Sequence, residues 1–100
     1  MYVPYLWMEN GMKALHFLRH GELDVVRYGE VPDPELRPGQ VLVKVRACAI
    51  NHLDIWVRRG WPGLKLAMPH WCGADVAGEV AQLGEGVTGW TIGRKVVVDP

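Results

Sequence analysis

Glycine and proline interrupt this chain so often that long helices are excluded. Three prolines and a glycine fall within residues 31–39, and four glycines fall within residues 84–93. Proline removes a backbone hydrogen-bond donor and glycine lowers helix stability, so both segments are predicted to be loops or turns. The stretches between them hold only short elements, which favours a small, mainly β domain of the barrel or sandwich type.

The clearest strand of the sequence is predicted between residues 41 and 49. Apolar residues occupy every second position from Val41 to Ala49, and Lys44 and Arg46 fall on the other face. Such alternation is typical of a strand with one buried side. The period changes over residues 51–59, where Leu53, Trp56 and Val57 share one face of a short helix that ends before Gly60.

Two further strands are predicted over residues 76–83 and 96–98, the second of them buried. Gly78 lies inside the first strand, where a bulge or a close backbone approach is expected. The segment Gly84–Gly89 matches the glycine pattern of dinucleotide-binding loops, but a valine-rich strand follows it instead of a helix. We therefore interpret its glycines as turns between two antiparallel strands.

Composition excludes several classes of partner. Eleven basic residues balance eleven acidic ones, so the chain has no charge excess to bind nucleic acid or an anionic membrane. No apolar run approaches the ~20 residues of a membrane-spanning helix. The two cysteines are interpreted as reduced, buried thiols, which favours a cytoplasmic protein. Residues 1–11 are interpreted as an N-terminal extension whose translation is open, because a regular pattern begins only at Met12.

Several motifs occur in a fixed order along the chain. They are MKAL from Met12, PGQVLVKV from Pro38, NHLD from Asn51 and GADVAG from Gly73. Together they resemble the N-terminal, GroES-like domain of the medium-chain dehydrogenase/reductase family, which includes zinc-type alcohol dehydrogenases and quinone oxidoreductases. The resemblance covers residues 12–100 and implies a partly open β-barrel with one or two short helices.

The same resemblance implies an enzyme that is larger than this chain. Its partners would be a Rossmann cofactor domain, a small-molecule substrate and further copies in a homo-oligomer, and its cofactor would be NAD or NADP. The expected reaction is hydride transfer to a carbonyl, enone or quinone. The 100-residue chain is expected to be an inert fragment by itself. The alternatives are a non-enzymatic module that binds or assembles through its barrel face and the remnant of a truncated gene.

The resemblance also implies that a catalytic zinc is absent. Two positions that hold zinc ligands in the alcohol dehydrogenases carry Asn51 and Ala74 here. A catalytic zinc needs about three protein ligands, so these two losses leave too few. The cysteines of a structural zinc would follow a stretch like Val96–Pro100, so that metal is expected only beyond residue 100. Cys48, Cys72, His70 and Asp75 match no metal motif, and strand alternation does not bring the two cysteines together.

Five residues are candidates for the site, each with a plainer alternative. Asn51 and Asp54 would be catalytic, with the Asn51 amide donating to the substrate oxygen, or they would only cap the helix. His52 and Arg59 would contact the coenzyme phosphates. Otherwise His52 is an exposed residue at the helix start, and Arg59 interacts with the helix C-terminus, which we favour. Asp75 would support the site from behind or belong to a turn.

Four tryptophans lie within residues 56–90, which is more than the interior of a small barrel needs. They are Trp56, Trp61, Trp71 and Trp90. Some of them would line the cleft toward the cofactor domain. An exposed aromatic face predicts self-association of the isolated chain.

Overall fold

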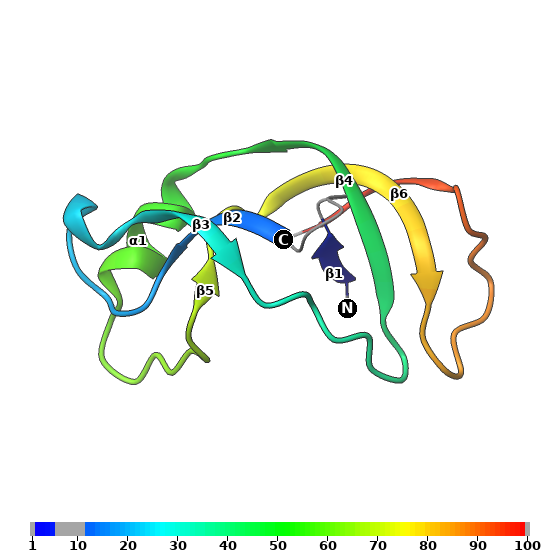
Figure 1. The fold of residues 1–100 in the computed structure, drawn as a ribbon, viewed down its shortest axis with the longest axis horizontal. Coiled ribbons are helices and arrows are strands. Elements are labelled where there is room, and N and C mark those ends of the chain that lie inside the picture. The colour runs from blue at the N-terminus through cyan, green and yellow to red at the C-terminus, as the bar shows by residue number, and fades with distance from the viewer. Residues whose placement is uncertain (1, 6–11, 100) are drawn as a thin grey trace.

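The computed structural model describes residues 2–5 and 12–99, and within them the chain is mainly β with two short helices. A four-stranded sheet has the order β1 (Tyr2–Tyr5), β4 (Val41–Ala49), β6 (Asp75–Leu83), β7 (Lys95–Val97). A three-stranded sheet has the order β3 (Arg27–Val31), β2 (Met12–Phe17), β5 (His70–Trp71). The helices are the 3-10 turn η1 (Leu23–Val25) and α1 (His52–Arg59). The expected mainly β, GroES-like architecture is confirmed (Figure 1).

The antiparallel strands β4 and β6 run side by side through the molecule and connect its two ends (Figure 1). Their register shifts between Leu42 and Val43 and again between Val45 and Ala47. Such irregularities bend a strand and change which side its later residues face. At Gly78 the two backbones approach so closely that a Cβ atom would overlap the carbonyl oxygen of Lys44. The expected close approach at this glycine is confirmed.

The core consists mostly of strand residues. Phe17 on β2, Val43 on β4 and Val80 on β6 are its largest fully enclosed side chains. The prediction of a buried strand at residues 96–98 is wrong, because Val97 is 81% exposed. The physical reason is its position, since β7 is an edge strand and pairs on one side only with β6. A run of valines does not distinguish an edge strand from a central one.

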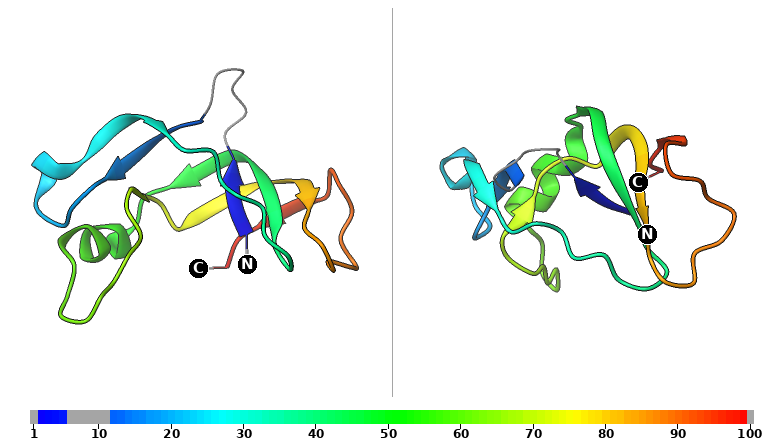
Figure 2. Two further views of the ribbon diagram at one scale, coloured as in Figure 1. Left: turned by 60° about the horizontal axis from the view of Figure 1, so that its bottom comes forward. Right: turned by 45° about the vertical axis from the view of Figure 1, so that its right-hand side comes forward.

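The glycine-rich segment 84–93 forms turns between β6 and β7, which are antiparallel as expected. Hydrogen bonds join this segment to the proline-rich loop. The Gly39 amide donates to the Glu85 carbonyl at 2.9 Å, and the Gly84 amide donates to the Gln40 carbonyl at 2.7 Å. The interpretation of the dinucleotide-like pattern as turns is therefore confirmed. Figure 2 shows the segment at the opposite end of the molecule from α1.

Two segments near the N-terminus differ from the sequence expectation. Tyr2–Tyr5 forms β1, which pairs in parallel with β4, although we expected no regular element before Met12. The loop predicted over residues 31–39 begins one residue later, because Val31 pairs with Met12 of β2 and is the buried last residue of β3. Residues 6–11 lie outside the described part of the chain. Within that part no helix has the length and apolar character needed to span a membrane.

Candidate functional site

The site is built around the start of α1, which is held by a reciprocal pair of hydrogen bonds. The Leu53 amide donates to Asn51 Oδ1 at 2.7 Å, and the Asn51 amide donates to Asp54 Oδ2 at 2.9 Å. These bonds satisfy backbone donors that a helix start otherwise leaves unpaired. The predicted capping role of Asn51 and Asp54 is confirmed.

Two further hydrogen bonds connect the helix cap to the start of β6 and to the residues just before it. Asn51 Nδ2 donates to Asp75 Oδ2 at 2.7 Å, and the Gly73 amide donates to Asp54 Oδ1 at 2.8 Å. Three of the five predicted site residues, Asn51, Asp54 and Asp75, therefore form one network. Because hydrogen bonds to a carboxylate are strong, this network fixes α1 against the first residue of β6.

The other two predicted residues lie apart from that network. His52 is exposed, and its ring packs edge-on against Trp56 with 4.8 Å between the ring centroids. Arg59 lies at the other end of the helix, where its Nε is 3.5 Å from Glu22 Oε1. The Arg59 guanidinium thus has a carboxylate neighbour as well as the helix C-terminus.

The helix is oriented differently from what its apolar face indicates. Arg58 is its buried residue, at 8% exposure, whereas Trp56 on the apolar face is 55% exposed. Hydrogen bonds to the helix backbone explain this orientation. The Gly21 amide donates to the Arg58 carbonyl at 3.0 Å. His20 Nδ1 donates to the Val57 carbonyl at 3.0 Å. The segment around residues 20–22 therefore anchors the C-terminal end of α1 and leaves its apolar face toward the cavity and solvent.

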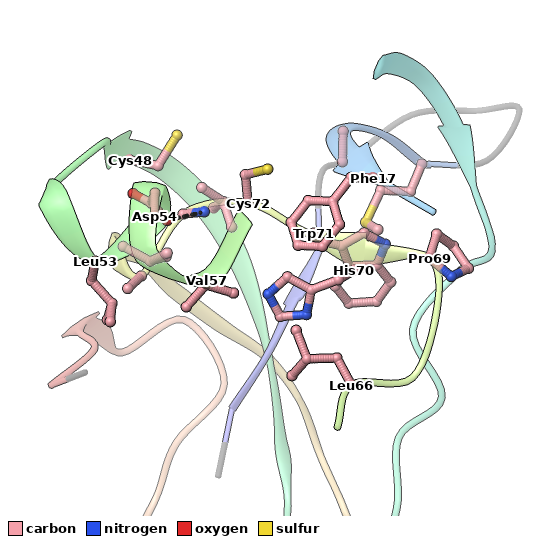
Figure 3. A pocket seen from close by; sticks show the side chains of 16 residues that line it. Phe17, Cys48, Leu53, Asp54, Val57, Leu66, Pro69, His70, Trp71 and Cys72 are labelled. Carbon is pink, nitrogen blue, oxygen red and sulfur yellow. Dashed lines mark hydrogen bonds between the residues drawn. The ribbon is translucent and has the colours of Figure 1, made fainter. Parts of the chain in front are cut away.

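A cavity of about 610 Å³ lies between α1, β2, β5 and the start of β6 (Figure 3). Its wall is mostly apolar and includes Phe17, Leu53, Val57, Leu66 and Trp71. Cavities of this size with a few polar groups are typical of small-molecule sites. The sequence did not predict this wall, because Leu66 and the residues around it belong to an irregular loop with no periodicity.

Four groups on the wall can exchange protons: the Asp54 carboxylate, the His70 imidazole and the thiols of Cys48 and Cys72. Both Asp54 oxygens accept backbone hydrogen bonds, whereas no described residue is hydrogen-bonded to the His70 ring. Sequence reasoning missed His70 and Cys72 as residues of this wall, because it weighed His70 only as a metal ligand and Cys72 as a metal ligand or a buried thiol. Asn51 is not part of the wall but is joined to it, because its backbone amide donates to Asp54 Oδ2.

The surroundings in the wall shift the pKa values of two of these groups, His70 and Cys72. Burial lowers the pKa of His70, the neighbouring His20 lowers it further, and Asp54 partly opposes both effects. Burial raises the pKa of the Cys72 thiol, Asp54 raises it further, and Arg58 partly opposes the rise. At neutral pH the wall therefore presents an uncharged imidazole and a protonated Cys72 thiol.

The expectation that strand alternation separates Cys48 from Cys72 is wrong, because both line the same cavity. The register shift after Val45 is the reason, since it brings Val45 and Cys48 to the same side of β4. Both cysteines are free thiols, but the expectation that they are buried is wrong, because Cys48 is exposed and Cys72 is half-buried. Among the described residues, no three His, Cys, Asp or Glu side chains are grouped closely enough to hold a metal ion.

The tryptophans divide between the cavity and the surface. Trp71 lines the cavity, whereas Trp56, Trp61 and Trp90 are 55%, 49% and 43% exposed. Trp56 and Trp61 border a shallow pocket of about 290 Å³ beside Arg59. An exposed aromatic surface is therefore present, and the self-association expected from it stays a prediction.

Comparison with protein families matches the segment that carries three of the four motifs. A family described as "Alcohol dehydrogenase GroES-like domain" matches residues 37–100. The quinone oxidoreductase of Rattus norvegicus is 34% identical over 86 residues, which cover 85% of this chain and 26% of the relative. A zinc-type alcohol dehydrogenase-like protein of Schizosaccharomyces pombe is 36% identical over 88 residues, covering 84% of this chain and 25% of the relative.

Solved structures agree with this assignment. The quinone oxidoreductase of Coxiella burnetii is 38% identical with a TM-score of 0.75, and the match covers 86% of this chain and 28% of that one. The Escherichia coli quinone oxidoreductase, solved in complex with NADPH, is 27% identical with a TM-score of 0.73, and the match covers 86% of this chain and 26% of that one. The chain spans about a quarter of the length of these relatives.

Proposed function

The chain belongs to the alcohol dehydrogenase GroES-like domain family of medium-chain dehydrogenases/reductases, and on that premise we propose that it is the substrate-side domain of an NAD(P)H-dependent reductase. The reaction would be hydride transfer to a carbonyl, enone or quinone without a catalytic zinc. The supporting observation is the cavity of about 610 Å³, whose mostly apolar wall suits an uncharged substrate of this kind.

The donor set around α1 does not suit a catalytic zinc. Asn51 stands where the family places one ligand, and its oxygen already accepts the Leu53 amide at 2.7 Å. Its nitrogen donates to Asp75 and carries no free electron pair for a metal. Ala74 at the second position has no coordinating group. We therefore assign no step of the reaction to zinc.

A nicotinamide cofactor fits the chain in part. It would supply the hydride, and most of its contacts would come from the Rossmann domain, which these residues do not contain. His52 is exposed at the start of α1, where a phosphate would find a ring nitrogen and the positive end of the helix. Arg59 suits a phosphate less well, because it lies 3.5 Å from the Glu22 carboxylate.

Asn51 would act through the geometry of the site. Among the described residues one of its two amide hydrogens has an acceptor, on Asp75. Because Asn51 does not line the cavity, its part would be to position Asp54 and the helix start, while Asp75 holds its side-chain amide in place. A reductase of this kind, with the two free thiols and the exposed tryptophans, would be a cytoplasmic homo-oligomer.

A chimera tests this proposal. Residues 12–100 would replace the matching part of the Escherichia coli quinone oxidoreductase, and NADPH oxidation by 1,4-benzoquinone would be followed with and without a metal chelator. We expect turnover that the chelator leaves unchanged, and no saturable NADPH binding by the 100-residue chain alone. A folded chimera without turnover, or turnover that the chelator abolishes, would contradict the proposal.

A further inference from the structure

The His70 imidazole lines the cavity, and no described residue is hydrogen-bonded to its ring. Its ring lies 5.3 Å from the ring of Phe17, centroid to centroid, at an interplanar angle of 46°. In Figure 3 the imidazole points away from β5 into the space between Val57 and Leu66. The ring is thus supported by a tilted aromatic contact, and its nitrogens are left for a ligand or water.

The other polar groups of the wall are less suited to proton exchange. Both oxygens of Asp54 accept backbone amides, and Trp71 Nε1 is fully buried. The Cys72 thiol holds its proton more tightly than an ordinary thiol, because burial and Asp54 raise its pKa. A thiol is also a weak hydrogen-bond donor, which applies to Cys48 as well.

Resting on the proposed function, we infer that His70 is the residue that gives a proton to the substrate oxygen in this cavity. After the substrate carbon has accepted hydride from the reduced nicotinamide, the carbonyl π electrons become a lone pair on oxygen. The imidazolium N–H bond then breaks and an O–H bond forms. The substrate is reduced by one hydride and one proton, the nicotinamide is oxidised, and neutral His70 regains a proton from solvent.

The surroundings of His70 favour this direction of transfer. Burial and the nearby His20, which follows β2, disfavour the charged imidazole, while Asp54 on α1 favours it. Cys48 on β4 and Cys72 after β5 are the other titratable groups of the wall. A general acid is most effective when the environment prefers its deprotonated form only slightly, so that the proton is available and leaves readily. The Asp54 carboxylate, which opposes the effects of burial and of His20, fits that condition.

The first test uses the 100-residue chain and needs no turnover. The ring resonances of His70 would be followed by NMR during titration with 2-cyclohexen-1-one, with His16, outside the cavity wall, as the internal comparison. We expect the His70 signals and their pH midpoint to shift on binding while the His16 signals do not. Saturating ligand that leaves the His70 ring unchanged would overturn the inference, whatever the activity of the chimera.

The second test uses the chimera and the variant His70→Gln. Reduction by the unmodified chimera should fall as pH rises through the pKa of His70, and His70→Gln should remove that dependence and lower kcat by about 10²-fold or more. Glu35→Gln, in an exposed loop, should leave both unchanged. An unaltered pH profile in His70→Gln would refute the role of His70 while leaving the proposed reductase function intact.

Discussion

The four-stranded sheet and the region around the cavity are held together by different means. In the sheet, β4 and β6 are joined along their length, and Val43, Val80 and the close backbone contact at Gly78 fill the interior. Around the cavity, α1 is held by the hydrogen bonds of its cap, by the Gly73 amide that donates to Asp54, and by Asp75, which accepts from Asn51. The sheet region has only a smaller hollow of about 280 Å³ beside Val43 and Val96, whereas the region around α1 holds the cavity of about 610 Å³.

This difference indicates which half can carry chemistry. Backbone-to-backbone packing tolerates little change and leaves no free polar groups, which suits a scaffold. A cavity held by side-chain hydrogen bonds leaves groups such as His70 facing its interior. We expect substitutions in the sheet to affect stability first, and substitutions at the cavity to affect ligand binding as well.

The largest effect is expected from Gly78→Ala in the sheet. The added methyl group would overlap the Lys44 carbonyl, so β4 and β6 could not keep their spacing. We expect a loss of roughly 3 kcal/mol or more in the free energy of unfolding, measured in urea. Gly29→Ala in β3 is the matched control, because a Cβ there meets nothing within 4 Å. Equal losses of unfolding free energy in both variants would show that the close approach of β4 and β6 at Gly78 is not the cause of the loss.

A smaller effect is expected from Asp54→Ala at the cavity. The substitution leaves the amides of Asn51 and Gly73 without their acceptor, and we expect a loss of about 2 kcal/mol. Asp24→Ala removes a mostly exposed carboxylate that lies 3.8 Å from Arg19, and it should cost less than about 0.5 kcal/mol. Urea unfolding of both variants checks the difference, and equal stabilities would mean that the cap network contributes nothing.

Acid should weaken the cavity region through His70. Its pKa is lowered by burial and by His20, so below the ordinary histidine pKa the unfolded chain binds a proton that the folded chain does not. Stability should fall as pH drops through the ordinary histidine pKa, near 6.5, and level off below the pKa of folded His70. Thermal melts across that window check this, and a profile that is equally steep in His70→Gln would assign the loss to other groups.

Self-association should depend more on the surface beside α1 than on the edge strand β7. Trp56 and Trp61 expose a larger apolar area beside α1 than Val97 exposes on β7. We expect Trp56→Ser to lower the association constant in sedimentation by about tenfold, and Val97→Lys to lower it less. The opposite order would assign the self-associating surface to the edge of the sheet.

The last prediction concerns the relative reactivity of the two thiols, whose labelling should affect the fold least. Cys48 is exposed, whereas burial and Asp54 raise the pKa of Cys72. Because the thiolate is the reactive form, iodoacetamide at neutral pH should modify Cys48 well before Cys72, with the gap narrowing in alkali. Mass spectrometry of timed samples checks the order. Faster labelling of Cys72 would contradict the buried environment described for it.

The elements with strong local signals could be predicted from the sequence. Alternation placed the strand at 41–49, and the spacing of Asn51 and Asp54 placed the helix cap. Glycines and prolines placed the loops at 31–39 and 84–93, except that Val31 still belongs to β3. The family resemblance is confirmed by the match over residues 37–100. The catalytic and coenzyme-binding roles of the candidate residues stay predictions.

The features that sequence reasoning missed share a cause. Val97 is exposed because β7 lies at a sheet edge, and Arg58 is buried because the segment around residues 20–22 anchors the end of α1. Neither the edge position of β7 nor the contact between α1 and the segment around residues 20–22 can be recognised from the local sequence pattern. Cys48 turns toward the cavity because of a register shift that depends on the pairing of two distant strands.

The amino-acid sequence by itself determined the element types, the turns and the helix cap, because these depend on backbone propensities and on side chains within a few residues of one another. Only the tertiary structure decided which face of each element is buried and that His70 and Cys72 share a wall with Asp54. Such placements depend on contacts between residues far apart in the chain, and a local pattern carries no information about which segments will meet.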